Sequence, residues 1–160
     1  MVIRTWNETD LPSLQALNAA AVPAVNGLSA PALSDLLAAA IVAPVVVDAS
    51  DRPVGFAICL PEGLNYASDN YRWFSAMYPE FAYIDRAVVA AEQRGLGLGG
   101  RLYDAVEAAV SGRTRLTCEV NLDPPNPGSL RFHQGRGFTE VGRQTTEGGA
   151  KQVILLAKQV

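Results

Sequence analysis

The chain has 160 residues, of which 49% are apolar and 18% are charged, and this is enough to bury a substantial core within one domain. Its net charge of −3, from 13 basic and 16 acidic side chains, provides no basic field for nucleic acid or an anionic membrane, so neither partner is expected. Because no apolar run is long enough to span a bilayer or placed to act as a signal peptide, we expect a single domain, residues 1–160, in the cytoplasm.

The first part of the chain predicts one strand and two helices. Residues 2–6 read as a short strand, and a helix follows to about Ala21, because apolar residues recur every three or four positions. Thr9 or Asp10 can cap that helix. A second helix is predicted over residues 30–41.

A hairpin and a long aromatic segment come next. The β-branched runs at 45–47 and 54–60 flank a polar turn, which is typical of two antiparallel strands. Residues 61–79 predict no regular element and are rich in aromatic side chains. Since long loops usually cover a functional site, we expect this segment to border one.

The second half alternates strands with helices. The predicted elements are, in order, a strand at 81–90, a helix at 98–111, a strand at 114–120, a short helix from 127 to 135 or 137, and a closing hairpin of 138–143 and 152–157. Asn126 and Pro127 suit the cap and the first residue of the short helix. The order of elements predicts an α/β domain with a mixed sheet.

The glycine turn between the strand at 81–90 and its helix is the first feature with chemical content. Its spacing, Gly95-x-Gly97-x-x-Gly100, is that of a dinucleotide-binding fingerprint, and Glu119 follows where a ribose-binding carboxylate belongs. However, five residues, 90–94, separate the strand from the first glycine, and the 60 residues after Gly100 leave little room for further βαβ units. An NAD(P)-binding protein therefore stays a minor alternative.

A different diphosphate fits the same turn. Glycines at the start of a helix leave backbone N–H groups open at its positive end, which suits the diphosphate of coenzyme A. The run Arg94-Gly95-Leu96-Gly97-Leu98-Gly99 resembles the Q/R-x-x-G-x-G/A motif of the GNAT superfamily of N-acetyltransferases. A purely structural role, a tight turn with close helix packing, is the alternative for these glycines.

A second motif of the same superfamily follows downstream. Asn126-x-x-Ser129-x-x-Phe132-His133-x-x-x-Gly137-Phe138 is similar to N-x-x-A-x-x-[LF]-Y-x-x-x-G-F, so the resemblance covers about residues 84–138. The phrases YASDNYRWF, FAYIDRAVV and CEVNLDPPNPGSLRFH also resemble a bacterial subgroup of predicted acetyltransferases. The main departure is His133, which stands where the family commonly has a tyrosine.

The resemblance implies the GNAT fold, in which a mixed, mostly antiparallel sheet is flanked by helices and splayed at the acetyl-CoA site. It further implies that one strand pairs with the pantetheine arm of the cofactor and that the glycine turn holds the diphosphate. The cofactor-binding residues expected on this basis are Val88, Val89, Arg94, Gly95, Leu96, Gly97, Leu98, Gly99, Gly100, Asn126 and His133.

The implied reaction is the direct transfer of an acetyl group to a primary amine in a ternary complex. An ammonium substrate must first lose a proton to a base, for which Glu119 and Asp85 are the candidates. A solvated or salt-bridged carboxylate, such as Asp85 paired with Arg86 or Arg115, is equally open for each. A backbone N–H near Val89 would polarise the thioester carbonyl. His133, the only histidine, shares a helical face with Asn126 and is the candidate proton donor to the leaving thiolate.

The acceptor is expected to be a small-molecule or peptide amine. Acidic residues around the inferred mouth of the site favour a cationic one. The residues expected to line its pocket are Asn26, Tyr66, Asn70, Tyr71 and Trp73, with packing into the core as the alternative for an aromatic side chain. A homodimer is left open.

Two other functional interpretations remain. A non-catalytic acyl-CoA-binding module would keep the phosphate turn without a proton relay, and the histidine in place of tyrosine leaves room for it. Covalent relay through Cys118, next to Glu119, is disfavoured because no histidine lies nearby in sequence. Cys118 and Cys59 lack metal-ligand spacing, so we expect buried, unreactive thiols and no metal site.

Overall fold

The computed structural model describes all 160 residues, and its strands form a seven-stranded sheet in the order β1-β2-β3-β4-β5-β7-β6. The strands are β1 (Val2–Thr5), β2 (Pro44–Val47), β3 (Pro53–Pro61), β4 (Ala82–Val89), β5 (Arg115–Asp123), β6 (Thr139–Thr146) and β7 (Lys151–Gln159). β4 and β5 pair in parallel, whereas β1–β2, β2–β3, β5–β7 and β6–β7 are antiparallel. The predicted mixed, mostly antiparallel sheet with flanking helices is therefore confirmed, while the splay at the cofactor site stays a prediction.

Five α-helices and three short 3-10 helices connect the strands. They are η1 (Glu8–Asp10), α1 (Leu11–Ala20), α2 (Ala30–Ala39), α3 (Asp69–Met77), η2 (Ala91–Gln93), α4 (Leu98–Val110), α5 (Pro127–Gly135) and η3 (Glu147–Gly149). None of them combines the length and the apolar composition that a bilayer span requires.

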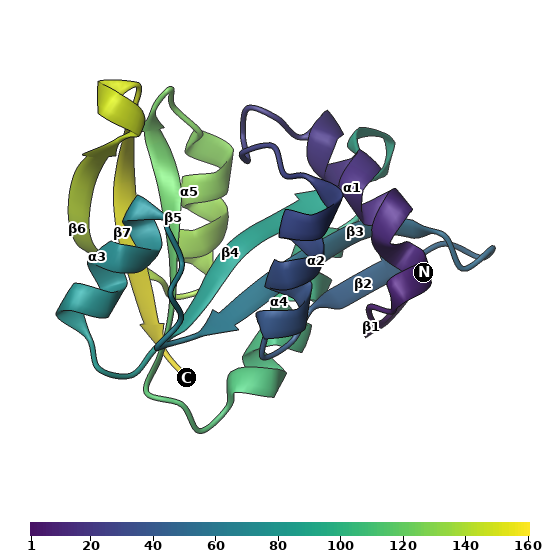
Figure 1. Cartoon of the computed structure of the whole chain (residues 1–160), viewed down its shortest axis with the longest axis horizontal. Helices are drawn as coiled ribbons and strands as arrows, with labels where there is room; N and C mark the ends of the chain where they lie inside the picture. The colour runs from purple at the N-terminus through teal and green to yellow at the C-terminus, as the bar shows by residue number, and fades with distance from the viewer. The chain divides into compact units, whose positions relative to one another are not determined.

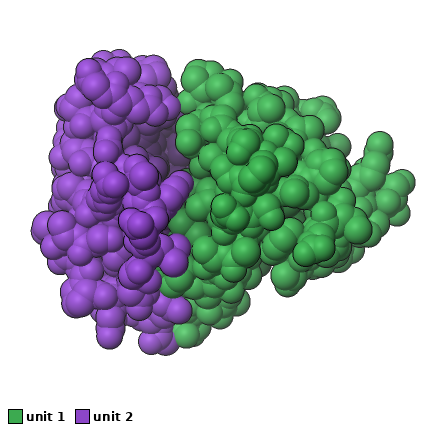
Figure 2. Space-filling model, viewed as in Figure 1, with its two compact units in different colours: residues 1–61, 84–111 green, residues 62–83, 112–160 purple.

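The chain groups into two compact units, coloured separately in Figure 2. Unit 1 consists of Met1–Pro61 and Ile84–Ser111, and unit 2 of Glu62–Tyr83 and Gly112–Val160. β4 thus contributes its first two residues to unit 2 and the rest to unit 1. The expectation of one functional domain over residues 1–160 stays a prediction.

Unit 1 is a layered arrangement around β1, β2 and β3. In Figure 1, α1 and α2 cover the near face of these strands and α4 lies behind them. Leu33 of α2, Phe56 of β3 and Leu102 of α4 are fully buried between these layers. Asp10 is the N-cap residue of α1, as predicted, although its side chain makes no cap hydrogen bond to that helix. Asn7 caps the preceding η1: its side chain accepts from the Thr9 amide while Asp10 accepts from the Asn7 amide.

Unit 2 is built on β5, β7 and β6, with α3 and α5. The prediction that residues 61–79 are irregular was wrong, because α3 occupies Asp69–Met77. Ser68 caps this helix by accepting from the Tyr71 amide at 3.2 Å. Tyr71 and Phe74 then face the core, where they pack with Phe81 in an aromatic cluster. α5 begins after Asn126 and ends at Gly135, as predicted.

Candidate cofactor-binding and proton-transfer residues

The glycine turn in unit 1 adopts a conformation that requires glycine. Gly95 has φ 81° and Gly97 has φ 74°, both in the left-handed region that side chains other than glycine rarely occupy. Gly97 is also the N-cap of α4, and no side chain caps this end of the helix. The first N–H groups of α4 therefore keep their capacity to bind an anion.

The surroundings of the turn fit a diphosphate. A methyl group added to Gly95, Gly97 or Gly99 would meet no heavy atom within 4 Å, so the backbone is open to an approaching ligand. Arg94 is exposed, and its guanidinium makes no hydrogen bond or ion pair in the structure. Open amides, the positive end of a helix and an uncommitted cation together suit the diphosphate of coenzyme A.

The end of β4 shows which backbone groups remain for the pantetheine arm. Ala90 donates its amide to the Val54 carbonyl at 2.8 Å, and the Val88 carbonyl oxygen lies beside Gly55, where a methyl group would meet it at 2.9 Å. Because successive strand residues direct their hydrogen-bonding groups to opposite sides, those of Val89 point away from β3. Val89 thus has the suitable backbone, whereas the carbonyl of Val88 is directed to β3.

Asp85 forms a buried ion pair with Arg86. The distance from Arg86 Nε to Asp85 Oδ2 is 2.6 Å, and the two side chains are 2% and 4% exposed. Arg86 also donates to Asn18 Oδ1 at 2.8 Å and to the carbonyl and side-chain oxygens of Asn26 at 3.1 and 2.8 Å. This arrangement favours the ion-pair alternative for Asp85 over a catalytic base.

The same contacts define the place of Asn26, a predicted acceptor residue. Both of its oxygens accept hydrogen bonds from Arg86, and Asn18 donates to its carbonyl at 3.1 Å. Asn26 therefore anchors the connection between α1 and α2 to β4. Only its side-chain amide nitrogen is left to contact the substrate that accepts the acetyl group.

Glu119 of β5 is held by a phenol hydroxyl in unit 2. Tyr83 Oη donates to the carboxylate, at 2.9 Å from Oε1 and 2.8 Å from Oε2. Tyr83 is 1% exposed, whereas Glu119 is partly exposed, so a buried hydroxyl holds a carboxylate that solvent still reaches. An accessible carboxylate in a fixed orientation can accept a proton from a substrate.

His133 is buried on α5 and hydrogen-bonded to its own helix. Its Nδ1 lies 2.7 Å from the Ser129 carbonyl oxygen, which can only accept, so Nδ1 carries the hydrogen. Burial lowers the pKa of the imidazole below its ordinary 6.5, the Ser129 carbonyl opposes this, and the nearby Arg136 adds to it. The neutral imidazole then presents Nε2 as an acceptor.

The lowered pKa of His133 predicts a specific loss of stability on acidification. Above about pH 6.5 neither the folded nor the unfolded imidazole is protonated; below it the unfolded state takes up the proton first, so stability falls until the pH reaches the folded pKa. In His133→Phe, the drop in Tm from about pH 7.5 to about pH 5.5 should be smaller. As this is the only histidine, equal drops in both proteins would contradict the assignment.

The side chain of Asn126 caps α5, so part of its hydrogen-bonding capacity is already used. Its Oδ1 accepts from the Ser129 amide at 3.3 Å, which leaves its amide group to donate. It shares unit 2 with His133, and the two residues begin and line the same helix. The predicted contact of Asn126 with the cofactor arm is therefore limited to donation from its nitrogen.

The other predicted acceptor residues lie in or beside α3. Tyr71 is 1% exposed, and its hydroxyl oxygen accepts from the Leu64 amide, which differs from the expected pocket wall. Tyr66 packs edge-on against it. Asn70 accepts from Gln144 of β6 at 2.8 Å.

Trp73 lies against β6. A methyl group on Gly142 would come within 2.4 Å of the indole, so only glycine permits this packing. The ring also meets Phe74 edge-on. These contacts favour the packing alternative for Trp73 over a place in the acceptor pocket.

Two residues with clear partners were absent from the predicted site, Tyr83 and Arg86. Both lie close to Asp85 on β4. Strand alternation indicates which side chains face the interior, and a polar side chain that is buried there needs a hydrogen-bond partner. The structure contains no group of three or more side chains suited to holding a metal ion.

The family model of the acetyltransferase (GNAT) family matches residues 14–138. Three solved structures share the fold over almost the whole chain. Arabidopsis thaliana NAA60 in complex with acetyl-CoA has a TM-score of 0.80 and 19% identity, with 99% of each chain covered. Ard1 from Thermoplasma volcanium has a TM-score of 0.80 and 18% identity, covering 99% of this chain and 97% of that one.

The third structure is the ribosomal-protein-alanine N-acetyltransferase from Brucella melitensis, with a TM-score of 0.75 and 21% identity over 100% of both chains. At these identities the likeness establishes the fold, and the family model adds the membership. Since that model covers most of the sequence, including both predicted motifs, the chain belongs to the acetyltransferase (GNAT) family.

Proposed function

We propose that this acyltransferase transfers an acetyl group from acetyl-CoA to a primary amine by direct attack in a ternary complex. The observation that carries this proposal is the glycine turn at the uncapped N-terminus of α4. It is supported by membership of the GNAT family, whose members use acetyl-CoA. Acetyl-CoA supplies the thioester, whose carbonyl carbon is open to a neutral amine.

On the cofactor side, the amides of residues 96–100 and the guanidinium of Arg94 would hold the diphosphate. The backbone of Val89, directed away from β3, would bind the arm and place an N–H donor near the thioester carbonyl. Such a donor stabilises the negative charge that develops on the carbonyl oxygen during acyl transfer. The side chain of Leu96 is 61% exposed, and only the backbone amide of this residue has a role in the proposed binding.

On the acceptor side, Glu119 would take the proton of the substrate ammonium, directly or through water. Tyr83 keeps the carboxylate oriented for this step through its two contacts. Asp85 is unsuited to it, because its charge is already matched by Arg86 in a buried pair. The base function is therefore assigned to Glu119 alone.

His133 has a proton-handling role that differs from that of a tyrosine. The bond from Nδ1 to Ser129 fixes the tautomer, so a proton can be received or released at Nε2. Burial disfavours the imidazolium at neutral pH, so donation to the leaving sulfur requires that a proton first reach Nε2. We therefore place His133 as a relay that accepts before it donates.

The acceptor is proposed to be a small-molecule or peptide amine. Among structural neighbours, the names include a ribosomal-protein-alanine N-acetyltransferase and a NatC complex bound to Gag peptide and CoA. Partly exposed acidic side chains such as Glu119 favour a cationic amine. A cytoplasmic location is proposed with it.

A thermal-shift comparison of acetyl-CoA, NAD and NADP, followed by an amine panel with detection of released thiol, tests the proposal. Stabilisation by acetyl-CoA alone, and thiol release that depends on one class of amine, is expected. Stabilisation by NAD or NADP would contradict the cofactor assignment. Binding of acetyl-CoA without thiol release across a broad panel would instead favour a non-catalytic acyl-CoA-binding module.

A further inference from the structure

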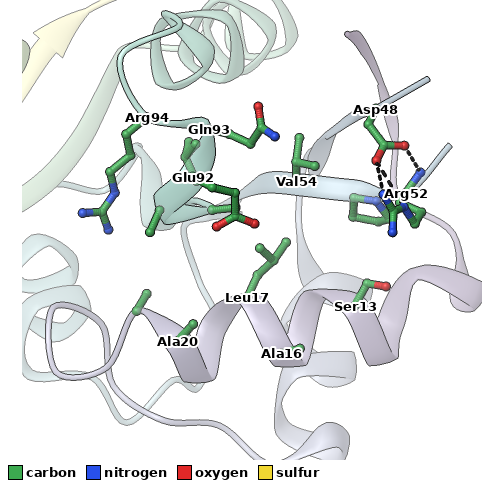
Figure 3. Close-up of a pocket in the computed structure, with 15 residues that line it drawn as sticks. Ser13, Ala16, Leu17, Ala20, Asp48, Arg52, Val54, Glu92, Gln93 and Arg94 are labelled. Atoms are coloured by element: carbon green, nitrogen blue, oxygen red, sulfur yellow. Dashed lines mark hydrogen bonds and ion pairs between the residues drawn. The ribbon is translucent and has the colours of Figure 1, made fainter. Parts of the chain in front are cut away.

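A groove of about 450 Å³ opens in unit 1 alongside α1 (Figure 3). α1 provides one wall, the turn between β2 and β3 another, and the end of β4 with η2 and Arg94 the third. Its volume lies within the range of about 300 to 1,000 Å³ that is typical of small-molecule sites. Of its lining residues, the proposed transfer chemistry uses only Val89 and Arg94, both on the cofactor side.

The floor of the groove is apolar. Leu17, Val54 and Val89 line it and are all partly exposed, and the remaining α1 positions facing it are mostly alanines. Partly exposed apolar side chains gain free energy when a ligand removes them from water. The body of a suitable ligand is therefore apolar.

Two of the four charged side chains around the groove pair with each other, and Glu92 and Arg94 are left without a partner. Asp48 and Arg52 pair with each other at 3.1 Å. Figure 3 shows the carboxylate of Glu92 directed toward Leu17, and the guanidinium of Arg94 pointing away from the groove. Glu92 makes no hydrogen bond or ion pair in the structure.

The C-terminal end of α1 adds partial negative charge beside the groove. The helix finishes at Ala20, which lines the groove, and no basic residue lies in its last turn. The carbonyl end of a helix carries partial negative charge, which favours a cation nearby. Glu92 and this helix end are independent features, and both select a positive group.

We propose that this groove is a second ligand site, which binds an organic cation with an apolar body, such as an arylalkylamine. The ammonium group pairs with Glu92 near the end of α1, and the apolar body covers Leu17 and Val54. The site consists of unit 1 residues and does not depend on acetyl transfer. Its failure and that of the proposed function are therefore distinguishable.

The first test is direct binding by calorimetry, without acetyl-CoA. 2-Phenylethylamine is the probe, phenylacetate has a similar body with the opposite charge, and ethanolamine has the charge without the apolar body. Binding of 2-phenylethylamine at least about fivefold tighter than of either control is expected. Equal affinity for phenylacetate, or no binding of the amine, would overturn the proposal.

Variants locate the site. Ala16→Leu fills the groove and should abolish binding of 2-phenylethylamine, whereas Ala19→Leu, also exposed on α1 but not lining the groove, should not. Glu92→Gln should weaken binding by about fivefold, and Glu8→Gln, an exposed carboxylate elsewhere in unit 1, should leave it unchanged. Binding that is equal in Ala16→Leu and Ala19→Leu would show that the amine binds elsewhere.

Discussion

Replacement of Gly97 by alanine is expected to raise the Kd for acetyl-CoA by about tenfold or more while the protein stays folded. Gly97 has φ 74°, and an alanine there is strained by roughly 1 to 2 kcal/mol, so the turn should relax and move its amides. A backbone hydrogen bond to a charged oxygen is worth about 1.5 to 3 kcal/mol, so the loss of one accounts for the expected change. Calorimetric titration with acetyl-CoA measures it.

Gly112 offers a matched control, because it follows the other end of α4. It has φ 92°, and a methyl group there would also meet no heavy atom within 4 Å. Gly112→Ala should therefore cost a similar amount of stability without changing the Kd for acetyl-CoA. If both variants bind acetyl-CoA like the unmodified protein, the turn does not hold the diphosphate; if both weaken it equally, strain alone is responsible.

Local patterns were sufficient to predict most of the fold. The β-branched runs of β2 and β3 and the Asn126-Pro127 start of α5 carry their own signals, and the structure has these elements where they were expected. α3 was missed because polar residues interrupt its short apolar spacing, and its cap, Ser68, follows a stretch without periodicity. Packing of Tyr71 and Phe74 in the core, which sequence does not show, stabilises this helix.

Part of the candidate site could likewise be predicted from the sequence, and part could not. The glycine turn is a contiguous motif, so its position and conformation could be anticipated from the spacing of glycines. The ion pair of Asp85 with Arg86 joins neighbours in sequence and could be anticipated. The further partners of Arg86 and the partner of Glu119 could not, because Asn18 and Asn26 lie 68 and 60 positions from Arg86, and Tyr83 lies 36 from Glu119. Side-chain chemistry alone left Asp85 and Glu119 equal; their surroundings separate them.

Because Glu119 is the remaining candidate for the base, its replacement should give the largest loss of activity that we expect. Glu119→Gln should lower kcat/KM for the amine by about a hundredfold or more, which is typical for the loss of a general base. Glutamine has the same size and keeps an oxygen that can accept from Tyr83, so the fold and the Kd for acetyl-CoA should be unchanged. Glu140→Gln, at an exposed carboxylate of β6 paired with Arg143, is the matched control and should retain full activity.

The pH dependence distinguishes a base from a merely structural carboxylate. An alkylamine such as a lysine side chain has a pKa of about 10, so the neutral form becomes more abundant in solution as the pH rises. A variant without the base depends on this neutral fraction, and Glu119→Gln should therefore recover activity as the pH approaches the pKa of the amine. A deficit that stays constant with pH would assign Glu119 a structural role, and an activity within about threefold of the unmodified enzyme at neutral pH would remove it from the mechanism.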